Sequence, residues 1–342
     1  MPGLPINDFS ASLFTIESAL LWLVLLVTAV SLDLVAGQYF ARYLPSIDTL
    51  FQRFVNAITK KLDRPSRTLT ALRLRGIFIA AILIPAAYYA GIFANYLMTT
   101  QLYTPLIALL ILIPVFGQKM SLTNVVEAGR RPEKNDPIRD PDPHAPLRQA
   151  GAVAILGFAL KLLPRTLWFC LGGFALLLPQ MLLATFVESA EKRKSGNVES
   201  PFFSFMALLY EFSTAPPAFI GALLLALAHF FLPGTNLWVL KAFDPRPVFF
   251  SGATFGPASR YFPLNVAAVG LSLSLEADIG EKTAGRKISD KTIHWIGPAD
   301  GRAQLMPANL RQIWLLTLIA LAFYFLIAAM VFLLLLQLGG SG

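Results

Sequence analysis

GIFIAAILIPAAYYAGIFANYLMTTQLYTPLIALLILIPVFGQ, residues 76–118, is a run of 43 residues without one charged side chain. A helix needs about 20 apolar residues to cross the hydrocarbon core of a bilayer, so this run is long enough for two crossings. The rest of the chain has the same character. Of its 342 residues, 56% are hydrophobic and only 14% are charged, against about 25% charged residues in soluble domains. The sequence therefore predicts an integral membrane protein and not a soluble enzyme.

Apolar stretches in the rest of the chain predict the remaining spans. The expected fold class is all-α: a polytopic transmembrane helical bundle of about six helices. The predicted helices are 14–35, 76–98, 102–117, 166–187, 213–233 and 312–337. A further apolar stretch, 150–163, is too short to cross a bilayer, and we expect it to be interfacial or re-entrant.

The distribution of basic residues predicts the domain organisation. Basic loops stay on the cytoplasmic side of a membrane, and the segments 36–75 and 119–165 each hold eight Lys and Arg. We therefore expect residues 1–240 to form a helical membrane region with these two segments as cytoplasmic loops. Residues 241–311 should form an extramembrane loop or cap, also cytoplasmic, before a final span at 312–338. The remaining 339–342 (Gly-Gly-Ser-Gly) resembles an expression-linker remnant, and the expected location is the bacterial cytoplasmic (inner) membrane.

The segment 36–75 carries eight bases against two acids. Beside a membrane, such a segment attracts anionic lipid, at about 1 kcal/mol per base near the surface, or meets an acidic partner. The expected partners are thus the bilayer, anionic lipids, and a membrane protein partner or a second copy of the chain, with no nucleic acid. The predicted lipid or partner surface consists of Arg42, Arg53, Lys60, Lys61, Arg64, Arg67, Arg73 and Arg75.

Few ionisable side chains fall inside or beside the apolar stretches. Asp33, Lys161 and Glu211 are the main ones. Charges at membrane depth are costly and often functional; the alternative is that Asp33 and Glu211 reach the interface, where the cost falls. The single cysteine, Cys170, and three scattered histidines show no zinc-ligand spacing, so no metal site is predicted.

Four stretches occur in a telling order: Leu32-Asp33-Leu-Val-Ala-Gly37; Arg73-Leu-Arg-Gly76; APPAFIGALLLALA at 215–228; and YFPLNVAAVG at 261–270, followed by Trp295-Ile-Gly297. In order and spacing they resemble the CobD/CbiB family of adenosylcobinamide-phosphate synthases of cobalamin biosynthesis, whose superfamily includes the AmpE-like membrane proteins. The resemblance extends over most of the chain. It implies that an active enzyme would use Mg²⁺ and a corrinoid, with Asp33, Glu211 and Asp300 as its catalytic residues.

The chain differs from the family at the positions that correspond to the family's acidic motifs. The family's Ala-Glu-Asn-x-x-Asp-Gly motif falls on residues 150–161, which contain no acid and end in Lys161. Its Asn-Thr-Leu-Asp motif is missing near 184–187, and Phe219 replaces its arginine. An amide-forming ligation needs acids for Mg²⁺ and bases for phosphate. We therefore expect a divergent, non-catalytic scaffold, regulatory protein or subunit of a membrane complex, with no catalytic residue and no cofactor; the alternative is an active synthase.

Overall fold

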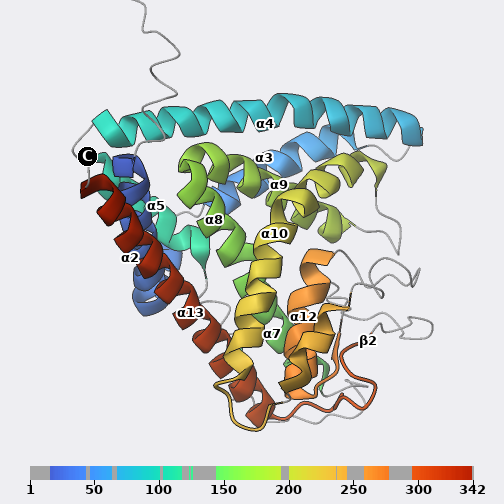
Figure 1. The fold of residues 1–342 in the computed structure, drawn as a ribbon. Coiled ribbons are helices and arrows are strands. Elements are labelled where there is room, and N and C mark those ends of the chain that lie inside the picture. Colours follow the sequence, from blue (N-terminus) through green and yellow to red (C-terminus); the bar gives the residue numbers. More distant parts are fainter. Residues whose placement is uncertain are drawn as a thin grey trace, which may run out of the picture. The chain divides into compact units, whose positions relative to one another are not determined.

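Most of the chain is described by a computed structural model. The described residues are 16–43, 47–63, 68–100, 103–117, 123, 125, 144–193, 200–235, 237–244, 258–276 and 295–340. The chain divides into two compact units. Unit 1 comprises Met1–Gly117, Pro164–Ser213 and Phe325–Gly342, and unit 2 comprises Gln118–Leu163 and Thr214–Tyr324. Figure 1 gives the labels of the elements.

Among the described residues, six helices are long and apolar enough to cross a membrane: Ala19–Gly37, Leu69–Thr100, Ala145–Gly172, Phe174–Arg193, Pro201–His229 and Pro307–Gln337. The predicted all-α polytopic fold is therefore confirmed, and the chain is an integral membrane protein. The first span lies within α2 (Ile16–Tyr43), the second is α4 (Leu69–Thr100), and the last lies within α13 (Pro307–Gly340). The sidedness of the connecting segments stays a prediction.

The crossing predicted at 102–117 is wrong. The helix there, α5 (Thr104–Phe116), has 13 residues, which makes it about 20 Å long, shorter than the ~30 Å hydrocarbon core. Both ends are set by local chemistry. Pro105 lies in the first turn, and Gly117 closes the helix in the left-handed conformation at φ 56°, which glycine adopts without steric cost.

Ala145–Gly172, which was not predicted as a span, is one of the six candidate spans. The sequence had predicted a cytoplasmic loop at 119–165, and the described part of that segment is helical instead. α7 (Ala145–Leu156), the π-helical turn η1 (Gly157–Leu162) and α8 (Leu163–Gly172) follow one another without a break. The stretch 150–163 is thus the middle of a long helix and not a short interfacial segment.

Pro164 accounts for the π turn. Proline has no backbone N–H, and its ring clashes with the carbonyl four residues earlier in a regular α-helix. In η1 the hydrogen bonds reach one residue further back, so that the N–H of Leu163 bonds to the carbonyl of Phe158. The extra residue in this turn moves the earlier carbonyl away from the proline ring, and the helix continues.

The span predicted at 166–187 is in fact divided. Gly173, at φ 59°, separates α8 from α9 (Phe174–Arg193). The following span also differs from the predicted 213–233, because it begins with the 3-10 turn η2 (Pro201–Phe203) and continues as α10 (Ser204–His229). Prolines inside membrane helices are tolerated when neighbours satisfy the freed carbonyls, so Pro216 and Pro217 do not end α10.

In unit 1, α4 packs along α9 (Figure 1), and it also contacts η2. A Cβ added at Gly76 would meet the backbone carbonyl of Phe202, and one added at Gly91 would meet the backbone of Phe174 and Ala175. The glycines therefore permit a close backbone approach. The buried core beside them consists of Val55, Leu72, Ala80, Leu182, Leu183, Phe186, Phe202, Phe203 and Met206.

The predicted loop at 36–75 is also mostly helical. α2 continues to Tyr43, α3 (Ile47–Leu62) follows, and α4 begins at Leu69. Asp48 lies in the first turn of α3, and Lys60 and Lys61 lie in its last turn, which matches the helix dipole at both ends. Between the spans within α2 and α4, Ile47–Leu62 is therefore an amphipathic helix.

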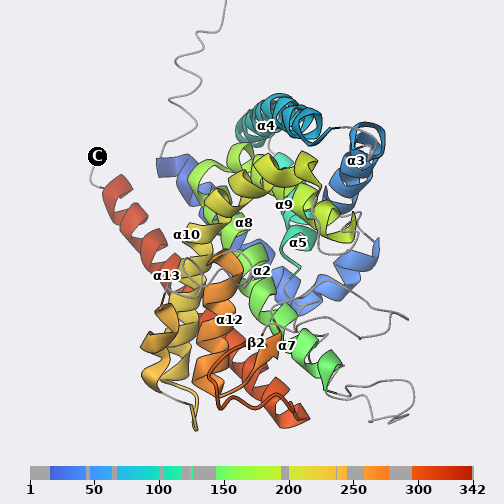
Figure 2. The ribbon, with the colours of Figure 1, turned by 90° about the vertical axis from the view of Figure 1, so that its right-hand side faces the viewer.

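Unit 2 contains the described part of the predicted cap at 241–311. Its elements are η3 (Leu237–Phe243), α12 (Ala258–Leu271) and the two-residue strands β1 (Leu275–Glu276) and β2 (Trp295–Ile296), which pair antiparallel. Figure 2 shows α12 beside α7, on which it packs.

Candidate functional site

The three acids proposed for catalysis lie on different elements. Asp33, in α2, is buried with 2% of its surface exposed, so it is enclosed by the protein and not exposed at the helix end. Glu211, in α10, is half-buried, and Asp300 is exposed in the turn that precedes Gly301. Among the described residues, no three His, Cys, Asp or Glu side chains form a group that could hold a metal ion.

The predicted basic surface is described in part. Arg53, Lys60, Lys61 and Arg73 are exposed on α3 and on the first turns of α4. Arg75 is half-buried, and its Nη1 donates a long hydrogen bond of 3.5 Å to the carbonyl of Leu62 at the end of α3. The side chain of Arg42, and residues Arg64 and Arg67, lie outside the described part of the chain.

The face that α3 turns toward the rest of unit 1 is partly polar. Asp48, Gln52, Val55 and Thr59 are spaced by four, three and four residues, which places them on one side of a helix. Val55 and Thr59 are fully buried, and the Thr59 hydroxyl donates to the Val55 carbonyl at 2.8 Å. Asp48 and Gln52 continue the same side toward the start of the helix, where they meet polar partners from other helices.

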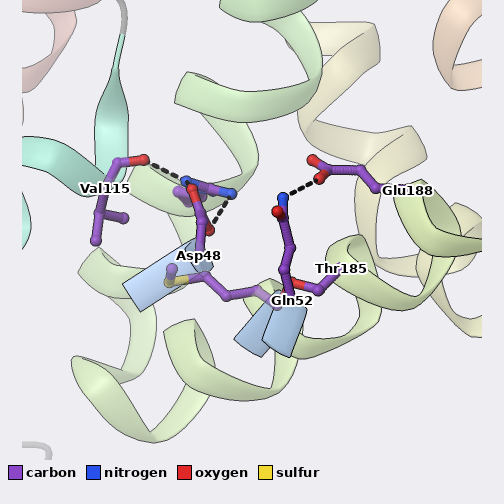
Figure 3. A network of polar contacts seen from close by, with 7 residues as sticks. Asp48, Gln52, Val115, Thr185 and Glu188 are labelled. Atoms are coloured by element: carbon purple, nitrogen blue, oxygen red, sulfur yellow. Dashed lines mark hydrogen bonds and ion pairs between the residues drawn. The ribbon is translucent and has the colours of Figure 1, made fainter. Parts of the chain in front are cut away.

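Asp48 forms a two-point ion pair with Arg165 of α8. Nη2 of Arg165 lies 2.9 Å from Oδ1 of Asp48, and Nη1 lies 2.9 Å from Oδ2. Nη1 also donates to the carbonyl of Val115 in the last turn of α5 (Figure 3). The exposed fractions are 3% for the arginine side chain and 17% for the aspartate side chain. A planar guanidinium matched to both carboxylate oxygens is the strongest form of such a pair, and this one joins α3, α5 and α8.

One turn further along α3, Gln52 makes a second link. Its Nε2 donates to Oε2 of Glu188 in α9 at 3.1 Å (Figure 3). Glu188 is exposed, so water competes for both groups and the bond contributes little, in the range of surface pairs at ~0–1 kcal/mol. The Asp48–Arg165 ion pair therefore contributes more to the position of α3 than the hydrogen bond between Gln52 and Glu188.

Asn95 stabilises the break between α8 and α9 with two hydrogen bonds to backbone groups. Its Nδ2 donates to the carbonyl of Gly172 at 2.9 Å, and its Oδ1 accepts the N–H of Phe174 at 2.8 Å. Asn95 is buried in α4, with 1% of its surface exposed. The break at Gly173 would leave both backbone groups unpaired in an apolar interior, so a single side chain replaces the hydrogen bonds that the interrupted helix lacks.

In unit 2, two polar contacts hold the segment that precedes α13. Arg148, buried in α7, donates from Nη1 to the carbonyl of Ala303 at 2.9 Å. At the start of the same helix, Nδ1 of His144 lies 3.0 Å from the carbonyl of Leu305. These contacts bind the segment that leads into α13. The buried Arg148 and the half-buried His144 thus contact backbone carbonyls, as Arg165 does in unit 1.

Sequence reasoning missed Asp48, Gln52, Asn95, Arg165 and Glu188. The helical spacing of Asp48, Gln52, Val55 and Thr59 was a usable signal for an inward face of α3. An arginine next to Pro164 in an apolar stretch was a second signal. The partners of these residues were not predictable, because each comes from a distant part of the chain.

Comparisons of the chain with protein-family models, with curated protein sequences and with solved structures find no match. The resemblance described above stays a prediction. What the geometry itself provides is a set of polar side chains, Asp48, Arg165 and Asn95, that bond to one another or to backbone groups and so hold helix ends and a helix break in place.

Proposed function

We propose that this protein is a non-catalytic scaffold subunit of a membrane complex, a divergent relative of the CobD/CbiB family. The observation that supports this most is the uneven burial of its six spans. In α4 and α13, 11% and 17% of the span window is buried, whereas the other four spans are 39–61% buried. Two long helices thus offer most of their surface to neighbours, either lipid or the helices of a partner.

The aromatic side chains of α4 favour a protein neighbour. Tyr88 and Tyr89 lie midway between Gly76 and Met98, with 37% and 68% of their surfaces exposed. Their rings pack edge to face, with centroids 5.7 Å apart. Tyrosine in membrane proteins concentrates at the two interfaces, and transfer of a hydroxyl into hydrocarbon without a partner costs about 4–8 kcal/mol. A partner helix with acceptor groups would remove that cost.

Site-specific photo-crosslinking should detect the partner. We expect p-benzoylphenylalanine in place of Tyr89 or Phe93, both exposed on α4, to give one discrete protein adduct when membranes of the native host are irradiated. The matched control is Leu106 of α5, a 63% exposed apolar residue of unit 1, where no discrete adduct should form. The adducts are read by gel shift and identified by mass spectrometry.

Adducts with lipid alone at Tyr89 and Phe93, at the level seen for Leu106, would contradict a partner on α4. An adduct between two copies of the chain would identify the complex as a homo-oligomer. Blue-native electrophoresis of the same membranes in mild detergent should then show one band larger than the 37.4 kDa chain, and the Tyr89 adduct should come from that band.

A second candidate function is the active synthase, which the burial of Asp33 favours. An acid enclosed within a membrane span is a functional candidate by default, and Asp33 is 2% exposed. The test is growth of a strain that lacks its own cobinamide-phosphate synthase. Under the scaffold proposal we expect no growth despite good membrane expression. Growth that is lost in Asp33→Asn, Glu211→Ala and Asp300→Asn, but kept in Asn56→Ala, would replace the scaffold with the enzyme.

A further inference from the structure

The outward face of α3 carries a stripe of exposed apolar residues in addition to its basic residues. Leu50, Phe54, Ala57 and Lys61 are exposed and are spaced by four, three and four residues, so they share one side of the helix. Leu50 is 54% exposed and Phe54 is 47% exposed. Asp48 and Gln52 lie on the inward side, among apolar residues of α3 that pack on the core of unit 1.

Polar contacts fix this orientation. If α3 rotated to turn Leu50 and Phe54 inward, the ion pair of Asp48 with the buried Arg165 would break. Val55 and Thr59, both fully buried, would move outward at the same time. The ion pair therefore keeps Leu50 and Phe54 on the outward side of α3.

The neighbouring elements place α3 at the level where spans leave the membrane. It is joined to α2 by residues 44–46 and to α4 by 63–68. α2 continues beyond its apolar window, and Tyr39 and Tyr43 there are about three-quarters exposed, at 75% and 74%. Tyrosines at the ends of spans mark the membrane interface.

The contact between α3 and α9 also places α3 near the membrane interface. α3 packs on α9, and Gln52 bonds to Glu188 in its last two turns. The residues that follow, through Lys192 and Arg193 at the end of α9, are mostly charged. The contact therefore lies where an apolar span gives way to a polar end.

Exposed bases flank the apolar face. Arg53 and Lys60 lie to one side of Leu50 and Phe54 on the helix, Lys61 ends the apolar stripe, and Arg73 follows in α4. A helix with apolar residues on its outer face and bases around them inserts into the boundary between headgroups and acyl chains, with its bases on anionic lipid phosphates. We propose that α3 lies in one leaflet in this way: Leu50 and Phe54 enter the acyl region, and Arg53, Lys60 and Lys61 bind anionic headgroups.

Spin labelling tests the immersion of α3. The single cysteine, Cys170, is replaced by serine, and labels are placed at Leu50→Cys, Phe54→Cys and, as the control, Asn56→Cys, an exposed polar position of the same helix. In reconstituted vesicles of phosphatidylcholine with phosphatidylglycerol, the labels at 50 and 54 should be reached by oxygen and shielded from a water-soluble nickel reagent. The label at 56 should be reached by nickel.

Charge neutralisation tests the lipid class. Electrostatic attraction is worth about fivefold in binding for each base that contacts an anionic headgroup at low salt. In Arg53→Gln/Lys60→Gln/Lys61→Gln we therefore expect the preference for spin-labelled phosphatidylglycerol over phosphatidylcholine to fall several-fold. The matched control, Lys241→Gln/Arg302→Gln/Arg311→Gln, removes three exposed bases of unit 2 and should leave it unchanged. Melting curves confirm that each variant is folded.

Three results would overturn the proposal. Nickel access at 50 and 54 would mean that the face is in water. Protection of both positions from nickel and from oxygen would mean that a protein covers it. An equal loss of phosphatidylglycerol preference in the two triple variants would mean that the attraction comes from net charge and not from α3.

Discussion

Replacement of Asp48 by alanine should lower the free energy of unfolding by about 3 kcal/mol, because it leaves the guanidinium of Arg165 buried without its counter-charge. The side chain of Arg165 is 3% exposed, and its two terminal nitrogens each lie 2.9 Å from a carboxylate oxygen. The Val115 carbonyl is the remaining acceptor in the contact, and one carbonyl cannot neutralise a full charge. The loss can be measured by titration with sodium dodecyl sulfate in mixed micelles, with tryptophan fluorescence as the readout.

Two controls separate the charge effect from general damage to α3. Gln52→Ala removes the link to the exposed Glu188 and should cost less than about 1 kcal/mol. The double variant Asp48→Leu/Arg165→Met removes both charges and should recover most of the stability lost in Asp48→Ala, because apolar replacement of a whole buried pair is often neutral. Equal losses in Asp48→Ala and Gln52→Ala would show that water reaches Arg165 and that the pair is not a main fastening.

Asn95→Ala should lower the free energy of unfolding by at least about 2 kcal/mol. It removes the only side chain that the structure shows bonded to both backbone groups at the α8–α9 break, the Gly172 carbonyl and the Phe174 N–H. Each buried backbone group left unpaired costs about 1–3 kcal/mol. The same detergent titration measures this loss, and hydrogen exchange at the Phe174 amide should increase.

Asn56→Ala is the matched control, since Asn56 is exposed on α3 and surface substitutions usually change stability by less than about 0.5 kcal/mol. Gly173→Ala perturbs the same break independently: at φ 59° a side chain is strained, and its Cβ would meet the amide of Asn95. If Asn95→Ala behaved like Asn56→Ala, another group would have to satisfy the break.

Most spans could be predicted from the sequence because a membrane helix is encoded by its local composition. Two helices were assigned incorrectly from the sequence. α5 is as apolar as a span, but Pro105 and Gly117 limit it to 13 residues. Conversely, Ala145–Gly172 contains Lys161 and Arg165, which divided its apolar residues into stretches that looked too short. Arg165 is tolerated there because Asp48 neutralises it, and Asp48 is 117 residues away in the chain.

The polar sites were less predictable than the fold for the same reason. The outward face of α3 can be read from the spacing of Leu50, Phe54 and Lys61, a local property. The bond of Asn95 depends on a helix break 77 residues further on. The family resemblance directed attention to Asp33, Glu211 and Asp300, whereas the observed network uses acids and amides outside the motifs of that family.

The contacts of Asp48 and Gln52 with later helices also set an order of events during synthesis of the chain. Asp48 and Gln52 leave the ribosome well before their partners, which lie 117 and 136 residues later. At about 5–20 residues per second, α3 waits on the order of ten seconds for Arg165 and Glu188 to be made. During that interval the exposed Leu50 and Phe54 can already rest on the membrane, while Asp48 and Gln52 lack these partners. The first part of unit 1 therefore reaches its final packing only after α8 and α9 have been inserted.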